Sequence, residues 1–133
     1  MQPTTIHTKK GTLKLIEPGI VKLTLKENIT WTLEDAKETH EANLKLTNSG
    51  KYCVYFLGSR FFIPTQEAQQ YAISKECTDH RVAVAFVPKK LGLLLFANLF
   101  MKTFKSKSPS KVFKSEDAAL KWLRETYKKS VTE

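Results

Sequence analysis

The sequence has few of the residues and motifs from which common catalytic and binding sites are built. Only five glycines occur among 133 residues, and none forms a glycine-rich phosphate loop. The two cysteines, Cys53 and Cys77, match no metal-binding or redox spacing, which argues against a disulfide framework and predicts two buried thiols. The longest apolar run, over residues 91–101, is far shorter than the roughly 20 residues that span a bilayer, and no signal peptide is recognisable. These absences predict a cytoplasmic chain.

Catalytic and metal-binding signatures are missing as well. The sequence contains no Walker lysine, GxSxG elbow or HExxH motif. Cys77, Asp79 and His80 could each bind a metal, but a structural zinc site usually needs four ligands and no second Cys/His pair stands at suitable spacing. The helical spacing around His40 places this residue on an inward face, where a lone histidine is more often packed than catalytic. The sequence therefore predicts a protein that is not an enzyme and holds no metal or cofactor.

The length and composition are typical of one globular domain, and the positive charge is unevenly distributed along the chain. The length predicts a single domain over residues 1–133, with an ordered core from about residue 12 to residue 128. The formal net charge is +9, and the segment Lys89–Lys129 alone holds eleven Lys and Arg against three acidic residues. Such an excess attracts anionic partners without selecting a phosphate backbone, an acidic lipid or an acidic protein.

Short strand patterns alternate with helical patterns along the chain. A Pro-Gly turn joins the first two strands as an antiparallel hairpin, and Thr32, Thr65 and Ser115 have the form of helix N-caps. The order β-β-α-β-α-β-α-β-α predicts an α/β domain with a mostly parallel mixed sheet and an N-terminal antiparallel hairpin. The expected strands are Thr12–Ile16, Ile20–Leu25, Tyr52–Leu57, Arg81–Val87 and Ser110–Phe113, the last at a sheet edge.

The run of residues 91–104 is the most distinctive stretch. At about 100° per residue, one broad apolar stripe is sufficient to dock this helix on the sheet. A second line, Leu91, Leu95 and Leu99, falls on the other side and is flanked by four lysines, Lys89, Lys90, Lys102 and Lys105. Three leucines in a line bordered by lysines indicate a contact surface. The line could be covered within the chain, by a protein partner or second copy, or by an anionic membrane surface.

Three segments carry a resemblance to a known family: the opening hairpin, the helix entry TLEDAKETHEANLKLTNSGKY with the strand CVYFL, and RVAVAFVPKKLGLLLFANLFMKTFKSKSPSKVFKSEDAALKWL. Over about Thr12–Leu123 the chain resembles small bacterial proteins of the SpoIIAA-like, STAS-related type. The resemblance implies a non-catalytic regulatory module in which phosphorylation of a Ser or Thr at a helix start switches partner binding. It therefore implies Thr65 and Ser59 as the candidate phosphoswitch, although the Asp-Ser-Ser/Thr-Gly motif is absent and Gln69 stands where relatives tend to carry Arg.

Together these features predict a regulatory or interaction module that binds a protein partner or itself through the helix over residues 91–104. The alternative is a protein that binds lipid or an anionic membrane surface through the same helix and its lysines. Nucleic-acid binding ranks third, because the charge permits it but no aromatic stacking platform or recognition helix is evident.

Overall fold

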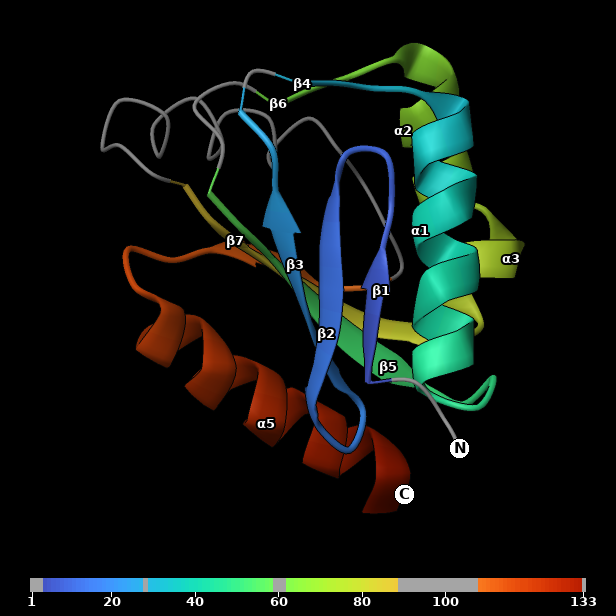
Figure 1. Cartoon of the computed structure of the whole chain (residues 1–133). Helices are drawn as coiled ribbons and strands as arrows, with labels where there is room; N and C mark the ends of the chain where they lie inside the picture. Colours follow the sequence, from blue (N-terminus) through green and yellow to red (C-terminus); the bar gives the residue numbers. More distant parts are fainter. Residues whose placement is uncertain (1–3, 28, 59–61, 89–107, 133) are drawn as a thin grey trace.

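A computed structural model describes residues 4–27, 29–58, 62–88 and 108–132. A mixed six-stranded sheet forms the centre of the molecule, in the order β1-β2-β3-β5-β7-β8 (Figure 1). The first three strands are antiparallel, and β3, β5, β7 and β8 are parallel. The strands are β1 (Thr5–His7), β2 (Gly11–Glu17), β3 (Ile20–Leu25), β5 (Tyr52–Leu57), β7 (Arg81–Val87) and β8 (Ser110–Val112). A separate pair of parallel strands, β4 (Ile29–Trp31) and β6 (Phe62–Pro64), lies beside it.

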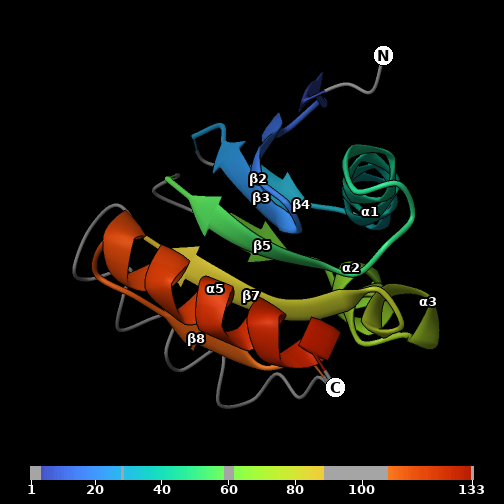
Figure 2. The ribbon, with the colours of Figure 1, turned by 90° about the horizontal axis from the view of Figure 1, so that it is seen from below.

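Helices cover both faces of the sheet. The helices α1 (Leu33–Leu46) and α2 (Gln66–Ala72) lie on one face, and α5 (Glu116–Thr132) lies on the opposite one (Figure 2). The short helix α3 (Lys75–Thr78) follows α2 directly. We call the two sides the α1 face and the α5 face.

The central strand β5 shows how the sheet supplies two cores. Its side chains alternate, so Tyr52 and Val54 pack on the α1 face while Cys53 and Tyr55 pack on the α5 face. All four side chains are buried. The expectation of strands covered on both sides is therefore confirmed for β5, and β7 behaves in the same way.

The helix ends follow the capping chemistry read from the sequence. The Thr32 hydroxyl accepts a hydrogen bond from the Asp35 amide and the Asp35 carboxylate accepts from the Thr32 amide, which is a complete capping box. Ser115 caps α5 by accepting from the Ala118 amide at 3.2 Å. The predicted caps are thus correct.

The turn between β2 and β3 packs against Tyr127 of α5. Gly19 has φ of +79°, a left-handed conformation that favours glycine. A Cβ atom at this position would lie 2.1 Å from the Tyr127 ring, so the ring occupies the space that only glycine leaves open. The hairpin predicted from the Pro-Gly link is confirmed, and its glycine also packs the last helix.

The sequence patterns missed several of the shortest elements. The strand β1 lies ahead of the predicted hairpin and adds a third antiparallel strand, while β4, β6 and α3 were not expected. The edge position of β8 is confirmed. The predicted helix over residues 91–104 lies outside the residues that the structure describes.

Candidate functional site

Most of the predicted site residues lie outside the described part of the chain. This holds for Ser59 and for the seven residues Leu91, Leu95, Leu99, Lys89, Lys90, Lys102 and Lys105. Their role stays a prediction.

Thr65, the remaining predicted site residue, lies at the start of α2. Its side-chain oxygen accepts a hydrogen bond from the Ala68 amide at 3.2 Å, and the residue is half-buried. The geometry makes Thr65 an N-cap, as the sequence indicated.

A cluster of buried polar side chains lies on the α1 face, between α1 and Tyr52 at the start of β5. Thr39, His40 and Asn43 of α1 are 6%, 4% and 2% exposed. The His40 Nδ1 atom lies 2.9 Å from the Tyr52 hydroxyl, and the rings of Tyr71 and His80 lie about 6 Å from the His40 ring. Three segments distant in the sequence therefore meet around His40, which occupies the inward position that its helical spacing predicted.

The electrostatics keep His40, Tyr52 and Cys77 uncharged near neutral pH. Burial lowers the pKa of His40, and the nearby His80 and Arg81 act in the same direction, whereas Glu76 raises it. Burial also raises the pKa of Tyr52 and of the Cys77 thiol. A neutral imidazole, a phenol and a protonated thiol can bind through hydrogen bonds, but none is an activated nucleophile.

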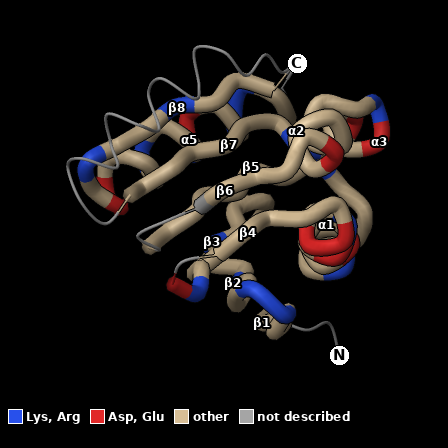
Figure 3. Tube along the Cα trace, turned by 90° about the horizontal axis from the view of Figure 1, so that it is seen from above, with Lys and Arg blue, Asp and Glu red and all other residues tan. Residues whose placement is uncertain are grey.

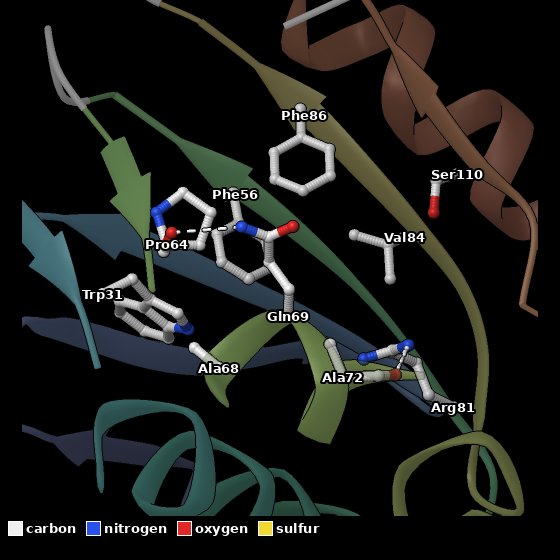
Figure 4. Close-up of a pocket in the computed structure, with 10 residues that line it drawn as sticks. All are labelled: Trp31, Phe56, Pro64, Ala68, Gln69, Ala72, Arg81, Val84, Phe86 and Ser110. Carbon is white, nitrogen blue, oxygen red and sulfur yellow. Dashed lines mark hydrogen bonds between the residues drawn. The ribbon is translucent and has the colours of Figure 1, made fainter. Parts of the chain in front are cut away.

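Two neighbouring hollows adjoin this cluster. The first, the polar cavity, has a volume of about 70 Å³ and contains Thr39, His40, Asn43 and Tyr52 in its lining. The second, the apolar pocket, has a volume of about 60 Å³ and lies between α2 and the strands (Figure 4). The two share four lining residues, Trp31, Phe56, Ala72 and Arg81.

The apolar pocket has an aromatic wall and three polar side chains, Gln69, Arg81 and Ser110. Figure 4 shows Phe56 and Phe86 facing Gln69 of α2, with Arg81 at one end of the pocket. The Gln69 amide nitrogen donates to the Pro64 carbonyl at 3.2 Å, and the Arg81 guanidinium donates to the Ala72 carbonyl at 2.5 Å. Gln69 and Arg81 are thus held by main-chain carbonyls at the pocket wall.

A wider hollow of about 380 Å³ lies elsewhere, between the β2–β3 turn, the end of α1 and Tyr127. Its lining contains none of the buried side-chain atoms that lack a hydrogen-bond partner among the described residues. It therefore offers less specific chemistry than the polar cavity.

Charge is distributed differently on the two outer helices. Figure 3 shows acidic residues gathered on α1, while Lys and Arg recur on α5 and β8. The described part of the predicted basic excess lies at Lys111, Lys114, Lys121, Arg124, Lys128 and Lys129. Part of it is paired, since Arg124 contacts Glu17 at 2.8 Å.

The sequence signal for the cluster was incomplete. Thr39, His40 and Asn43 are polar residues on the inward face of one helix, which hinted at a buried polar group. The partners Tyr52 and Arg81 come from strands and could not be paired with them from spacing alone. Among the described residues no group of three or more His, Cys, Asp or Glu is placed to hold a metal ion, and Asp79 pairs with Lys75 instead.

The fold and cavity define a small mixed-sheet α/β domain with a buried neutral polar cluster beside an aromatic pocket. The chain belongs to a family described as a domain of unknown function (DUF7793), whose family model matches residues 14–127. No curated protein and no solved structure matches the chain. In the part of the chain that the structure describes, no helix is long and apolar enough to cross a membrane.

Proposed function

We propose that this protein is a non-catalytic interaction module, related to the SpoIIAA-like and STAS-related regulatory proteins of bacteria, that acts in the cytoplasm. It works by contact with a protein partner or a second copy of itself, through the predicted helix over residues 91–104. The raised pKa values of Tyr52 and Cys77 argue against a thiolate or phenolate nucleophile in the polar cluster around His40.

The observation that carries the proposal is the parallel pairing of β7 with β8. Adjacent parallel strands are joined by a crossover connection, and nearly all such crossovers are right-handed. The crossovers from β3 to β5 and from β5 to β7 place α1 and α2 on the same face, and β8 continues in the same direction across the sheet. A third crossover of the same hand is therefore expected on the α1 face.

This direction of crossover gives the two sides of the predicted helix different roles. The apolar stripe would pack toward the sheet, near Phe86, an aromatic residue that is only partly buried among the described residues. Leu91, Leu95 and Leu99 would then face outward, with Lys89, Lys90, Lys102 and Lys105 beside them. An apolar line with a basic border fits an apolar surface that has acidic residues at its rim.

Sedimentation equilibrium tests this contact with a matched pair of variants. We expect the wild type to self-associate and Leu95→Lys to be monomeric. The control is Val131→Lys, because Val131 is an apolar residue of α5 that is 52% exposed, and α5 lies on the opposite face of the sheet from the expected crossover. A monomeric wild type at high concentration would remove self-association and leave a separate protein partner.

Membrane binding is the second candidate, and the lysines that border the leucine line favour it. Co-sedimentation with vesicles, with and without anionic lipid, separates it from a protein contact. Wild-type pelleting that requires anionic lipid and is lost in Leu95→Lys would support the membrane; no pelleting with any vesicle would remove it.

Thr65 and Ser59 remain the candidate phosphoswitch on the resemblance alone. Phosphorylation of Thr65 would place a dianion where its hydroxyl now caps α2. Intact mass of the protein isolated from its native cell is the direct check, and an unmodified mass under all growth conditions would argue against the switch.

A further inference from the structure

Three buried polar atoms of α1 line the polar cavity without a hydrogen-bond partner among the described residues. They are Thr39 Oγ1, His40 Nε2 and Asn43 Oδ1, on side chains that are all more than nine-tenths buried. Buried polar atoms are almost always hydrogen-bonded, because leaving one unsatisfied is costly. Three such atoms around one cavity indicate that something else binds them.

The hydrogen bonds around Tyr52 determine which of these atoms can donate a hydrogen bond and which can accept one. The Asn43 side chain donates to the Tyr52 oxygen, which lowers the pKa of that phenol against the larger effect of burial. The Tyr52 proton is then directed to His40 Nδ1 at 2.9 Å, so His40 Nε2 carries the ring hydrogen. The Glu76 main chain also accepts from the His40 ring, so the atoms that the cavity offers without a competitor are the Asn43 Oδ1 acceptor and the Thr39 hydroxyl, which can donate or accept.

We propose that the polar cavity is a ligand-binding site for an uncharged head group that both donates and accepts hydrogen bonds, such as a carboxamide or an alcohol. A cavity of about 70 Å³ has room for about two water molecules, or for a head group of about three or four heavy atoms. The apolar body of the ligand lies against Trp31 and Phe56, which line both this cavity and the apolar pocket.

Charged head groups fit the cavity less well. The charged and titratable groups that act on it are Arg81, Glu76, His80 and Cys77. Arg81 opposes a cation. It attracts a carboxylate, but its guanidinium already donates to the Ala72 carbonyl at 2.5 Å, and the Asn43 oxygen is an acceptor that would face the anion. Either ion would also lose its hydration on entering, which adds a large penalty unless it is paired.

Ordered water could satisfy the same three atoms, so the test has to separate a ligand site from a hydrated cavity. The probes are benzamide, benzoate and toluene, which share one ring and differ in the head group. Binding is followed by backbone amide NMR shifts of the full chain. We expect benzamide to shift the signals of residues 39–43 and Tyr52, and to bind at least about tenfold more tightly than benzoate or toluene.

A pair of isosteric variants tests the assigned atoms. Thr39→Val removes one cavity hydroxyl and is expected to weaken benzamide binding about tenfold. Thr126→Val makes the same change on α5, where the hydroxyl bonds the Trp122 carbonyl at 2.8 Å, and should leave binding unchanged. Leu95→Lys should also leave it unchanged, because this site is independent of the proposed contact surface.

Three results would overturn the proposal. The first is that benzamide does not bind and long-lived water is detected in the cavity. The second is that benzamide, benzoate and toluene bind equally well, and the third is that Thr39→Val and Thr126→Val weaken benzamide binding equally. The first result means ordered water only, and the other two mean nonspecific apolar binding.

Discussion

The two faces of the sheet are packed in different ways. On the α5 face, Leu123 and Ala119 pack on small and apolar strand residues and are fully buried. Its polar atoms lie at the rim and are paired: the Tyr55 hydroxyl donates to Glu116 at 2.5 Å, and Lys22 contacts the same carboxylate at 3.1 Å. On the α1 face, the buried residues include Thr39, His40 and Asn43, and two hollows remain between helix and sheet.

This difference separates structural stability from binding. A close-packed face gains free energy from every buried methylene, whereas a face with buried polar atoms and hollows gives up part of that gain. Proteins retain such unfavourable features mainly where they bind something. The α5 face should therefore dominate the stability of the domain, and the α1 face should dominate its response to ligands and pH.

Leu123→Ala should give the largest loss of stability. Leu123 is 0% exposed, and truncation leaves a cavity that α5 cannot close because Tyr127 is held against Gly19. We expect the free energy of unfolding to fall by about 3 kcal/mol, measured by urea denaturation. Val131→Ala on the same helix is the control, because Val131 is 52% exposed and should change stability by less than about 0.5 kcal/mol. Similar losses in both variants would mean that α5 does not depend on its buried face.

Tyr55→Phe should give the second-largest loss of stability. The substitution removes the hydrogen bond to Glu116 that joins β5 to α5, and it leaves a carboxylate whose pKa is lowered chiefly by that bond. Glu116 is partly exposed, so we expect a loss of about 1 to 2 kcal/mol in the same denaturation assay. Tyr71→Phe is the matched control on the α1 face, since the Tyr71 hydroxyl donates to Glu76 at an exposed site. Equal losses in the two variants would contradict the separation of the faces.

The pH dependence of stability tests His40 directly. Burial lowers the pKa of His40 in the folded chain below its ordinary value of 6.5. The unfolded chain therefore binds a proton first as the pH falls below about 6.5, and the free energy of unfolding decreases through this window. His40→Asn should flatten the curve between neutral pH and pH 5, while the exposed His7→Asn should not. Losses from Asp35 and Glu116, whose pKa values are also lowered, occur at more acidic pH.

Sequence periodicity predicted the elements that bury large apolar surfaces. The covered strands β5 and β7, the opening hairpin and the edge strand β8 were all anticipated, as were the caps at Thr32, Thr65 and Ser115. The strands β1, β4 and β6 were missed, because three residues do not establish a period. The equally short β8 was recognised from its position between the break at Pro109 and the helix cap at Ser115. Pro64 also reads as a loop residue rather than as the end of a strand.

The polar cluster could not be predicted for a different reason. The pattern around His40 indicated an inward face, and the structure confirms that His40 is buried. Periodicity reports that a side chain is buried, but it does not report which side chain lies opposite. Tyr52 and Arg81 reach His40 only because β5 and β7 are neighbours under α1 and α2, which is a property of the tertiary fold.

Thr39→Val should give the smallest effect on stability and the most informative one. The Thr39 hydroxyl is buried without a partner among the described residues, so its removal relieves a desolvation penalty at nearly constant volume. We expect the free energy of unfolding to stay within about 0.5 kcal/mol of wild type or to rise. Thr126→Val loses a formed hydrogen bond to Trp122 and should be the less stable of the two variants. A loss above about 1 kcal/mol in Thr39→Val would mean that water already satisfies the hydroxyl in the free protein. Combined with weaker benzamide binding, unchanged stability would show that this atom serves the ligand rather than the fold.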